Sequence, residues 1–237
     1  MTSSRRWKRR AAVWAAAAGC SLGCMAETNT ASRFGFTGPE IFPVENLITQ
    51  LHVADIDGDG LNDIIVVNNV RSRINILYNQ TGKTNQPARP GPAARREVNE
   101  LPPDSRFRIE SIASEKRIFS LVVADLNGDR RPDLAYYGEP KELVVLYNQG
   151  TNGWSAPKRW PIEDGQLSAN ALCSGDLNAD GRSDLVLLGE TCIYFLPQGK
   201  DGALGEPRKI PFSGAVKSVQ VVDIDGDGLS DLMLVNW

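Results

Sequence analysis

Short apolar runs separated by polar segments recur along most of this 237-residue chain. Some runs alternate apolar with polar residues, as in Leu51–Val53, and others are continuously apolar, as in Ile64–Val67. Most are rich in β-branched or aromatic residues and are bounded by Asn or Gly. Such runs are typical of β-strands and are too short for amphipathic helices. The pattern therefore predicts an all-β fold.

The apolar runs follow the same order in four consecutive segments. In each segment an alternating run precedes an acidic turn, and a continuous run follows it. The predicted first strands contain Leu51–Val53, Leu121–Val123, Leu172–Ser174 and Val219–Val221, and the predicted second strands are Ile64–Val67, Leu134–Tyr137, Leu185–Leu188 and Leu232–Val235. The predicted third strands are Ile74–Tyr78, Leu143–Tyr147 and Cys192–Leu196, and the predicted outer strands include Ser155–Ile162 and Pro207–Phe212. Each segment is therefore predicted to be a four-stranded antiparallel meander, the size of one β-propeller blade.

An acidic nonapeptide of the form Asp-x-Asp/Asn-x-Asp-Gly-x-x-Asp lies in the turn between the first two strands of each segment. Its four copies, called loops 1 to 4 below, are residues 55–63, 125–133, 176–184 and 223–231. Their starts are 70, 51 and 47 residues apart, and a period of about 50 residues indicates a repeat array or a propeller. Residues 81–105 account for the longer first interval, and their Pro, Arg and polar residues predict a surface insertion.

The spacing of the acidic side chains in these loops suits calcium, which takes about six to eight oxygen ligands. Side chains at positions 1, 3 and 5 can converge on one point, the carbonyl at position 7 adds an oxygen, and the Asp at position 9 closes the cage. Glycine at position 6 permits the sharp turn because it tolerates positive φ. Magnesium is less suited to such a crowded protein cage. The predicted calcium ligands are Asp55, Asp57, Asp59, Leu61, Asp63, Asp125, Asn127, Asp129, Arg131, Asp133, Asp176, Asn178, Asp180, Arg182, Asp184, Asp223, Asp225, Asp227, Leu229 and Asp231.

Two other interpretations of the loops are weaker. An EF-hand begins with the same residues but needs an acidic ligand at position 12, where this chain has Val66, Tyr136, Leu187 and Leu234. Plain Asp-rich turns that favour a hairpin are the other alternative. The four loops hold 14 of the 29 acidic residues, and carboxylates crowded in this way repel one another without a cation. The fourfold recurrence therefore favours metal binding.

The loops resemble those of the FG-GAP and VCBS repeats, the blades of integrin-α-like β-propellers. Tyr137–Pro140 resembles the Gly-Ala-Pro strand ending of that family, and Gly153–Pro157 resembles the Gly-x-x-x-Pro turn of VCBS repeats. The resemblance covers about residues 45–237. It implies calcium ligands in all four loops and a closed propeller, typically of seven blades, used as an interaction domain. Arg130 at position 6, Ala179 at position 4 and the small number of repeats depart from the family pattern.

The fourth segment contains only two predicted strands, Lys217–Val222 and Leu232–Trp237. Pro39–Asn46 has no acidic loop before it and is a candidate outer strand for closing a ring. Three blades and half of a fourth are fewer than a closed propeller needs. We therefore expect consecutive blades of an incomplete β-propeller. Unpaired sheet edges in such an array favour self-association, unless the chain continues into further C-terminal blades.

Residues 1–26 have the composition of a secretory signal peptide. A basic head, which includes Arg5 and Arg10, precedes an apolar run of small residues from Ala11 to Ala26. This run is shorter than the roughly 20 residues of a membrane-spanning helix. Cleavage before Glu27 is expected, and lipid attachment at Cys20 and an uncleaved anchor are alternatives. We therefore expect a secreted or periplasmic protein, without a membrane span after cleavage, whose blades lie in residues 27–237.

The charge of the chain changes when the expected signal peptide is left out. The whole chain has 26 Lys and Arg against 29 Asp and Glu. Residues 1–26 hold five of the basic residues and no acidic one, so residues 27–237 carry 21 basic and 29 acidic residues, a net charge of −8. An acidic surface of this kind disfavours nucleic acid and anionic membranes as partners.

Few residues outside the loops are candidates for chemistry. Cys173 and Cys192 form no Cys-x-x-Cys pair, and their predicted strands are not neighbours, so two buried, unpaired thiols are expected. His52 is the only histidine, and no nucleophile motif accompanies it. Trp154 and Trp160 are expected to cover the edge of a blade, with stacking on sugar rings as the alternative.

Together these features predict an exported, calcium-binding interaction module for an extracellular protein or glycan. Neither Gly-x-Ser-x-Gly nor His-Glu-x-x-His occurs, and we expect no enzymatic activity. One alternative is the non-catalytic propeller portion of a larger secreted carbohydrate-active enzyme. A purely architectural spacer is the other.

Overall fold

A computed structural model of the chain describes residues 42, 44, 46–83 and 105–236. These residues form fourteen β-strands and one short 3-10 helix, Gly150–Asn152. The all-β class predicted from the sequence is confirmed. No helix in the described part of the chain is long and apolar enough to cross a membrane. The expected signal peptide, residues 1–26, lies outside the described residues.

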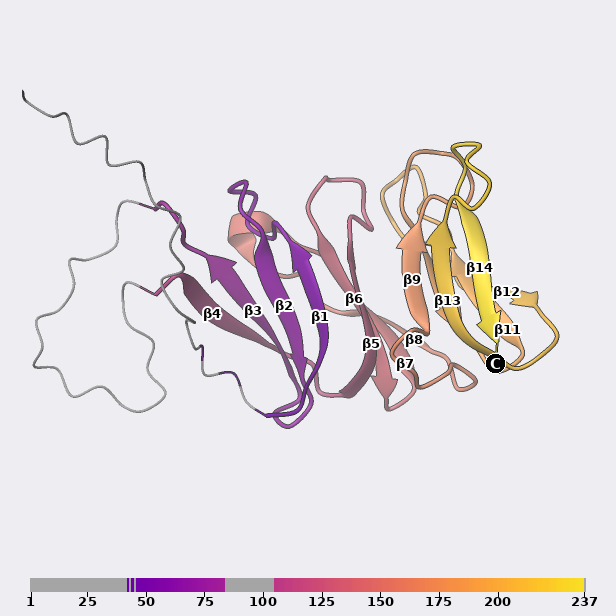
Figure 1. The fold of residues 1–237 in the computed structure, drawn as a ribbon, viewed down its shortest axis with the longest axis horizontal. Coiled ribbons are helices and arrows are strands. Elements are labelled where there is room, and N and C mark those ends of the chain that lie inside the picture. Colours follow the sequence, from indigo (N-terminus) through magenta and orange to yellow (C-terminus); the bar gives the residue numbers. More distant parts are fainter. Residues whose placement is uncertain (1–41, 43, 45, 84–104, 237) are drawn as a thin grey trace, which may run out of the picture. The chain divides into compact units, whose positions relative to one another are not determined.

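The first sheet contains strands β1 (Ile48–Ala54), β2 (Asp63–Asn68), β3 (Arg73–Asn79) and β4 (Phe107–Ala113). They pair in sequence order, and every pair is antiparallel, so the sheet is a simple meander (Figure 1). The predicted insertion falls between β3 and β4, and residues 84–104 within it lie outside the description. The first predicted blade is therefore present, with its outer strand after the insertion.

The second sheet repeats this meander with β5 (Arg117–Ala124), β6 (Asp133–Glu139), β7 (Glu142–Leu146) and β8 (Lys158–Pro161). The predicted outer strand Ser155–Ile162 is longer than β8. The residues before β8 instead form a hairpin that is closed by an isolated bridge between Asn148 and Trp154. Ser155, Ala156 and Pro157, which were expected to begin the outer strand, follow this hairpin and belong to no strand.

The third sheet contains β9 (Leu172–Gly175), β10 (Asp184–Leu188), β11 (Cys192–Leu196) and β12 (Arg208–Pro211). Its outer strand is one residue shorter than predicted at each end, and Gln198 and Leu204 close a hairpin before it like that of the second sheet. Cys173 on β9 and Cys192 on β11 are separated by β10, and both thiols are free, as predicted. The predicted burial is confirmed for Cys192, whereas Cys173 is only half-buried.

The fourth sheet has two strands in the described part of the chain, β13 (Val216–Val222) and β14 (Asp231–Asn236). The segment 39–46, predicted as an outer strand, lies largely outside the described residues. Phe42, Val44 and Asn46 are described there, and none of them belongs to a strand. The described residues therefore show three complete four-stranded blades and a two-stranded one.

Successive sheets pack face to face through apolar cores. Ile65 and Ile74 of the first sheet meet Leu134 and Tyr136 of the second sheet in one core. A larger core joins the second, third and fourth sheets through residues that include Tyr137, Leu143, Leu185, Leu187 and Val219. The first strands of successive sheets are also neighbours: β1 contacts β5, β5 contacts β9, and β9 contacts β13. Consecutive propeller blades pack in this way, with the first strand innermost.

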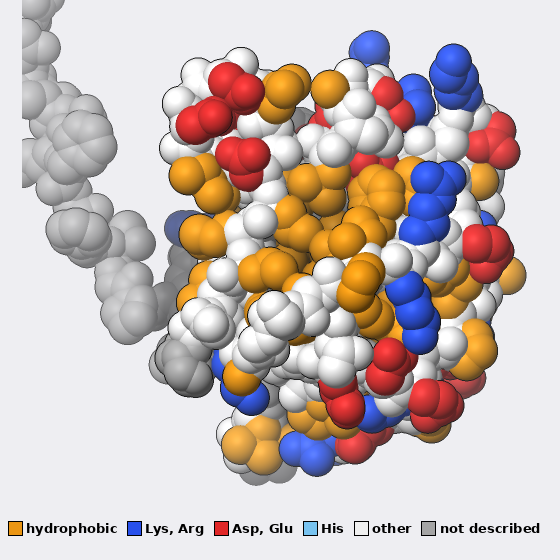
Figure 2. Space-filling view, turned by 90° about the vertical axis from the view of Figure 1, so that its right-hand side faces the viewer, with side chains coloured by type: hydrophobic (Ala, Val, Ile, Leu, Met, Phe, Trp, Pro, Cys, Tyr) orange, Lys and Arg blue, Asp and Glu red, His pale blue; other side chains and the backbone are white. Residues whose placement is uncertain are grey.

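The first and last sheets expose apolar side chains that the inner sheets bury. Leu51 on β1 is 66% exposed, whereas Leu121, at the same place on β5, is 2% exposed because the first sheet packs nearby. At the other end Val222 and Ile224 are 40% and 61% exposed. Figure 2 shows hydrophobic side chains gathered on the face at the β12–β14 end, beside acidic ones. Each end thus presents an apolar face of the kind that adjoining blades cover elsewhere in the chain.

These exposed faces predict that the chain from Glu27 self-associates in solution, even with calcium present. Replacing Leu51 and Val53 together by threonine keeps β-branched or strand-compatible side chains and removes apolar surface from the β1 face. We expect the double variant to be shifted toward smaller species in size-exclusion chromatography with light scattering. Val70→Thr, in the β2–β3 turn and 54% exposed, is the matched control and should leave the distribution unchanged. A monodisperse wild-type monomer that unfolds cooperatively would contradict the prediction.

Candidate metal centres

Each acidic loop connects the first strand of a sheet to the second strand. Loop 1 joins β1 to β2, loop 2 joins β5 to β6, loop 3 joins β9 to β10, and loop 4 joins β13 to β14. Position 9 of each loop is the first residue of the following strand. All four loops therefore occupy the same end of their blades, as the hairpin prediction requires.

Two positions in every loop have a left-handed backbone. Position 6 has positive φ, as predicted, and position 4 does as well. The φ values at positions 4 and 6 are 75° and 84° for Gly58 and Gly60, 79° and 65° for Gly128 and Arg130, 60° and 79° for Ala179 and Gly181, and 78° and 86° for Gly226 and Gly228. Sequence reasoning missed the requirement at position 4, although glycine at that position in three loops was a usable signal. Loops 2 and 3 each contain one residue with a side chain where glycine fits best.

The Asp at position 1 organises the backbone of its own loop. In loop 1, Oδ1 of Asp55 accepts hydrogen bonds from the amides of Gly58, at 2.8 Å, and Asp59, at 3.1 Å. Its Oδ2 accepts from the amide of Gly60 at 2.8 Å. Asp125, Asp176 and Asp223 make equivalent contacts in the other loops. These bonds favour the tight turn, because they satisfy amides that the left-handed backbone points inward.

In loops 1 to 3 the Asp at position 9 joins its own loop to a residue at or just after the end of the third strand. Asp133 is fully buried, and its Oδ2 accepts a hydrogen bond from the amide of Leu126 at position 2, at 2.8 Å. Its Oδ1 accepts from the amide of Asn148, at the end of the third strand, at 2.7 Å. Asp63 and Asp184 are also fully buried and make the same two kinds of bond. The sequence predicted that the Asp at position 9 is a calcium ligand. The structure shows in addition that its hydrogen bonds stabilise the blade.

Burial makes the ionised form of these position-9 carboxylates costly. The pKa of Asp133 is raised to about 6, mainly by desolvation and also by the charges of Asp129 and Asp125, against the opposing effect of the bonds from Asn148 and Leu126. Desolvation also raises the pKa of Asp63 and Asp184. A cation bound in the loop would offset this cost, since a nearby positive charge favours the ionised carboxylate.

Loops 1 and 4 bring three carboxylates to one point. Oxygen atoms of Asp55, Asp57 and Asp59 all lie within 4.8 Å of one another, and the same holds for the equivalent residues of loop 4, Asp223, Asp225 and Asp227. Hard oxygen donors converging at this separation fit the ligand preference of calcium. These two loops therefore have the donor set that the sequence predicted at positions 1, 3 and 5.

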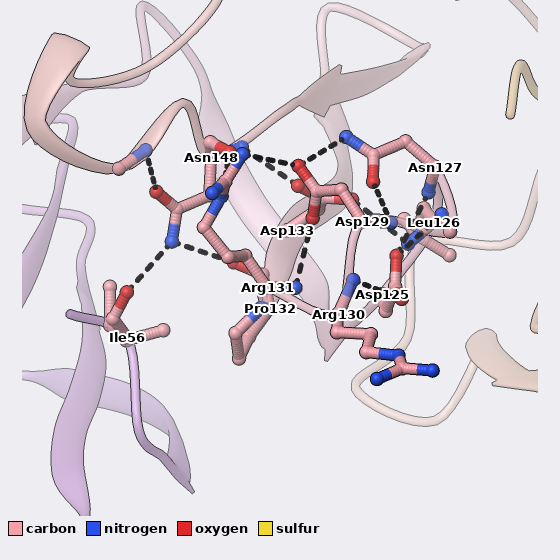
Figure 3. A network of polar contacts seen from close by, with 12 residues as sticks. Ile56, Asp125, Leu126, Asn127, Asp129, Arg130, Arg131, Pro132, Asp133 and Asn148 are labelled. Carbon is pink, nitrogen blue, oxygen red and sulfur yellow. Dashed lines mark hydrogen bonds and ion pairs between the residues drawn. The ribbon is translucent and has the colours of Figure 1, made fainter. Parts of the chain in front are cut away.

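Loops 2 and 3 have an asparagine at position 3 and a different polar network. Asn127 donates from Nδ2 to Oδ2 of Asp129 at 3.1 Å, and its Oδ1 accepts from the amide of Asp129 at 2.9 Å (Figure 3). In loop 3, Nδ2 of Asn178 donates to Oδ1 of Asp184 at 3.4 Å. The amide oxygen of either asparagine is a suitable calcium ligand, but each of these loops has one carboxylate fewer than loops 1 and 4.

The acidic loops also form contacts between adjacent blades. Asn148, in the hairpin after β7, donates from Nδ2 to the carbonyl of Ile56 in loop 1 at 2.8 Å (Figure 3). In the next blade, a Cβ atom at Gly202 would lie 2.3 Å from the carbonyl oxygen of Asn127 in loop 2. The hairpin between the third and outer strands of one blade therefore touches the acidic loop of the preceding blade. Blade packing and loop conformation are coupled at these points.

Other candidate residues lie away from the loops. His52 is half-buried beside a pocket of about 410 Å³ along the first strands of the sheets, and burial lowers the pKa of its imidazole. Cys173 lines the same pocket. Burial raises the pKa of its thiol to about 12, which makes the thiol a poor nucleophile. Trp160 is 6% exposed with Lys158 above its ring, whereas Trp154 is half-buried against the first core. Trp160 therefore covers the blade, as predicted, and is not available for stacking on a sugar.

Residues 125–187 and 176–234 each match the FG-GAP-like repeat model. Each match begins at position 1 of one loop and ends just after the next loop. Residues 125–234 belong to the FG-GAP-like repeat family. The FG-GAP-like repeat thus runs from loop to loop, whereas the structural blade begins at the strand before a loop. Loop 1 lies outside the two matches and has the same nine-residue pattern.

Solved structures with the same architecture include a lectin from Agrocybe aegerita that specifically recognises non-reducing terminal N-acetylglucosamine. It has a TM-score of 0.53 and 16% identity, over 78% of this chain and 46% of the lectin. The Tc holotoxin pore of Photorhabdus luminescens has a TM-score of 0.44 and 16% identity, over 81% of this chain and 9% of the toxin chain. No curated protein matches the sequence. This chain spans less than half of the lectin, and the likeness to the lectin shows the fold alone.

Loop 2 provides a test of backbone strain. The Arg130 side chain points away from the loop carboxylates in Figure 3, and its φ of 65° is strained for any residue with a Cβ atom. We predict that Arg130→Gly stabilises the protein by about 1 kcal/mol and tightens calcium binding at loop 2. Denaturant unfolding and isothermal titration measure the two effects. Gly228→Arg, the reverse change at position 6 of loop 4, is the control and should destabilise; a loss of affinity in Arg130→Gly would refute the prediction.

The contact between blades at Gly202 gives a second prediction. Alanine at position 202 would have to adopt a left-handed backbone, with φ of 76°, and its Cβ atom would clash with the carbonyl of Asn127. Gly202→Ala should therefore cost about 2–4 kcal/mol in stability. Gly181→Ala is the matched control, because its φ is 79° and nothing lies within 4 Å of the added Cβ atom. We expect the control to cost only about 1 kcal/mol in chemical denaturation. Equal losses in the two variants would show that the contact between blades contributes nothing.

Proposed function

We propose that this chain is an exported, calcium-stabilised interaction module. The observation that carries the proposal is the convergence of three carboxylates within 4.8 Å in loops 1 and 4, of which loop 4 lies within the FG-GAP-like match. Crowded carboxylates oppose folding unless a cation offsets their repulsion. Export, suggested by the basic and apolar character of residues 1–26, would bring the loops into a compartment where weak calcium sites can fill.

In each loop the side chains at positions 1, 3, 5 and 9 and the carbonyl at position 7 would hold the ion. Bound calcium would supply positive charge to the loop. Its role would be structural and not catalytic. The position-1 and position-9 carboxylates accept backbone hydrogen bonds that hold them in place. Preorganised ligands reduce the ordering cost of binding.

The interaction role is supported by a pocket between adjacent blades. This pocket, of about 350 Å³, is lined by Asp57, Tyr78, Arg108 and Glu110 of the first blade and by Trp154 of the second. Aromatic and charged side chains side by side suit a polar ligand with an apolar face, such as a sugar ring. A related fold in a lectin is compatible with a glycan as the ligand class. We propose an extracellular protein or glycan as the partner.

An enzyme-associated role is a second candidate. The chain spans only part of the solved structures that it resembles, so a catalytic domain elsewhere in a larger protein is compatible with the fold. A glycan array and a pull-down with the secreted protein separate these roles. Glycan or protein binding by the isolated chain supports the interaction module, and failure in both assays favours a purely architectural role or a dependence on another domain.

Removal of calcium is the direct test of the structural role of the ion. Sites with dissociation constants of about 10⁻⁴ M contribute roughly 2.7 kcal/mol each at a hundredfold excess of calcium. A chelator should therefore lower the Tm of the purified chain by on the order of 10 °C. Added calcium should restore the Tm, and an equal concentration of magnesium should restore less of it. An unchanged Tm after chelation would refute the proposal.

A further inference from the structure

The position-7 arginines of loops 2 and 3 make the same pair of contacts. Arg131 forms an ion pair from Nη2 to Oδ2 of Asp129, at position 5, at 2.9 Å, and its Nε donates to the carbonyl of Asn148 at 3.2 Å. In loop 3, Arg182 pairs with Asp180 through the same atoms, and its Nε donates to the carbonyl of Gln198 at 3.2 Å. Asn148 and Gln198 hold equivalent places after the third strand. Each guanidinium therefore links a loop carboxylate to a residue that follows the third strand.

Loops 1 and 4 have leucine at position 7 and lack this brace. In loop 1 a lysine from outside the loop approaches instead: Nζ of Lys83 lies 2.6 Å from Oδ2 of Asp59 and 3.5 Å from Oδ2 of Asp57. In loop 4, no basic side chain among the described residues forms an ion pair with the carboxylates. The four loops thus differ in the positive charge that the chain itself provides.

We propose that Arg131 and Arg182 are tethered counter-ions that keep loops 2 and 3 folded without a bound cation, so that calcium acts mainly on loops 1 and 4. This inference rests on the proposed calcium binding, and it assigns that binding unequally among the loops. The two middle blades would then form a metal-independent core. The first and last blades, which carry the exposed apolar faces, would depend on calcium for their order.

The physical basis is that calcium and the arginine guanidinium compete for the same carboxylate oxygen atom. In loops 2 and 3 both oxygens of the position-5 carboxylate are engaged, Oδ1 by the position-7 amide and Oδ2 by the guanidinium. A calcium ion bound at Oδ2 would lie beside the positively charged guanidinium, and the two charges would repel each other. Arginine stays charged at all ordinary pH values, and its planar fork bonds the carboxylate and the strand carbonyl at once. In loop 1 both oxygens of Asp59 are also engaged, Oδ1 by the amide of Leu61 and Oδ2 by Lys83, but this lysine lies outside the loop and lacks the planar fork of arginine. In loop 4, Asp227 uses only Oδ1, toward the amide of Leu229, among the hydrogen bonds of the described residues.

The leucines of loops 1 and 4 define the test. Arg131→Leu and Arg182→Leu, combined in the full-length chain, give loops 2 and 3 the position-7 residue that this backbone already accepts elsewhere. Without calcium the double variant should have a lower Tm than the wild type. With calcium it should recover, bind more ions per chain in equilibrium dialysis, and bind them about fivefold more tightly at loops 2 and 3, as expected from loss of a competing exposed ion pair.

The reciprocal variant is Leu229→Arg, which places arginine at position 7 of loop 4. It should reduce the number of ions bound and weaken the response of the Tm to calcium. Its loop lacks a third strand among the described residues, so only the ion pair to Asp227 is available. Unchanged stoichiometry and affinity in both variants would overturn the inference and leave the proposed calcium binding intact. A wild type that binds no calcium would overturn both.

Hydrogen exchange of the wild type keeps the test valid if the variants fold poorly. The amides at position 6 donate to the position-1 carboxylate in every loop, so their protection reports on loop conformation. In chelator, we expect protection at Arg130 and Gly181 and rapid exchange at Gly228. Calcium should slow exchange at Gly60 and Gly228 by at least about fivefold, and should change exchange at Arg130 and Gly181 much less. Equal changes in all four loops would contradict the inference.

Discussion

The fold depends on the accommodation of several carboxylates in one tight turn. Two unit charges about 4 Å apart repel by roughly 1 kcal/mol in water and about 4 kcal/mol at the effective dielectric near a protein surface. Each loop holds three or four such groups within nine residues. Backbone amides offset part of the repulsion, through the position-1 carboxylate within the loop and the position-9 carboxylate between strands. We propose that a cation offsets the remaining charge, either calcium or a basic side chain of the protein.

The same loops connect the blades. The hairpin of one blade touches the acidic loop of the preceding blade, at Asn148 and Ile56 in one case and at Gly202 and Asn127 in the other. A loop that loses its conformation therefore disturbs a contact between blades as well as its own hairpin. Repeat arrays gain stability from such interfaces between neighbours. The conformation of the charged loops and the packing of the apolar cores between blades therefore depend on each other.

Repetition made much of this structure predictable from the sequence. The acidic loops and the strands around them occur several times, and β11 has the bounds that its apolar run predicted, Cys192–Leu196. The alternation of Leu51 and Val53 correctly predicted a strand but could not show that both side chains are exposed, because burial there depends on an adjoining sheet. The buried bonds of Asp133 and the brace formed by Arg131 also depend on the third strand, which is distant in the sequence. The requirement for positive φ at position 4 was readable from the recurring glycine.

The central claim is that the acidic loops bind calcium. The most direct measurement is a crystal structure of the chain grown in millimolar calcium, with anomalous diffraction used to identify the ions. The account predicts anomalous density coordinated by the carboxylates of Asp55, Asp57 and Asp59 in loop 1 and by Asp223, Asp225 and Asp227 in loop 4, with weaker density in loops 2 and 3. Well-ordered loops without anomalous density at any of the four positions would contradict it.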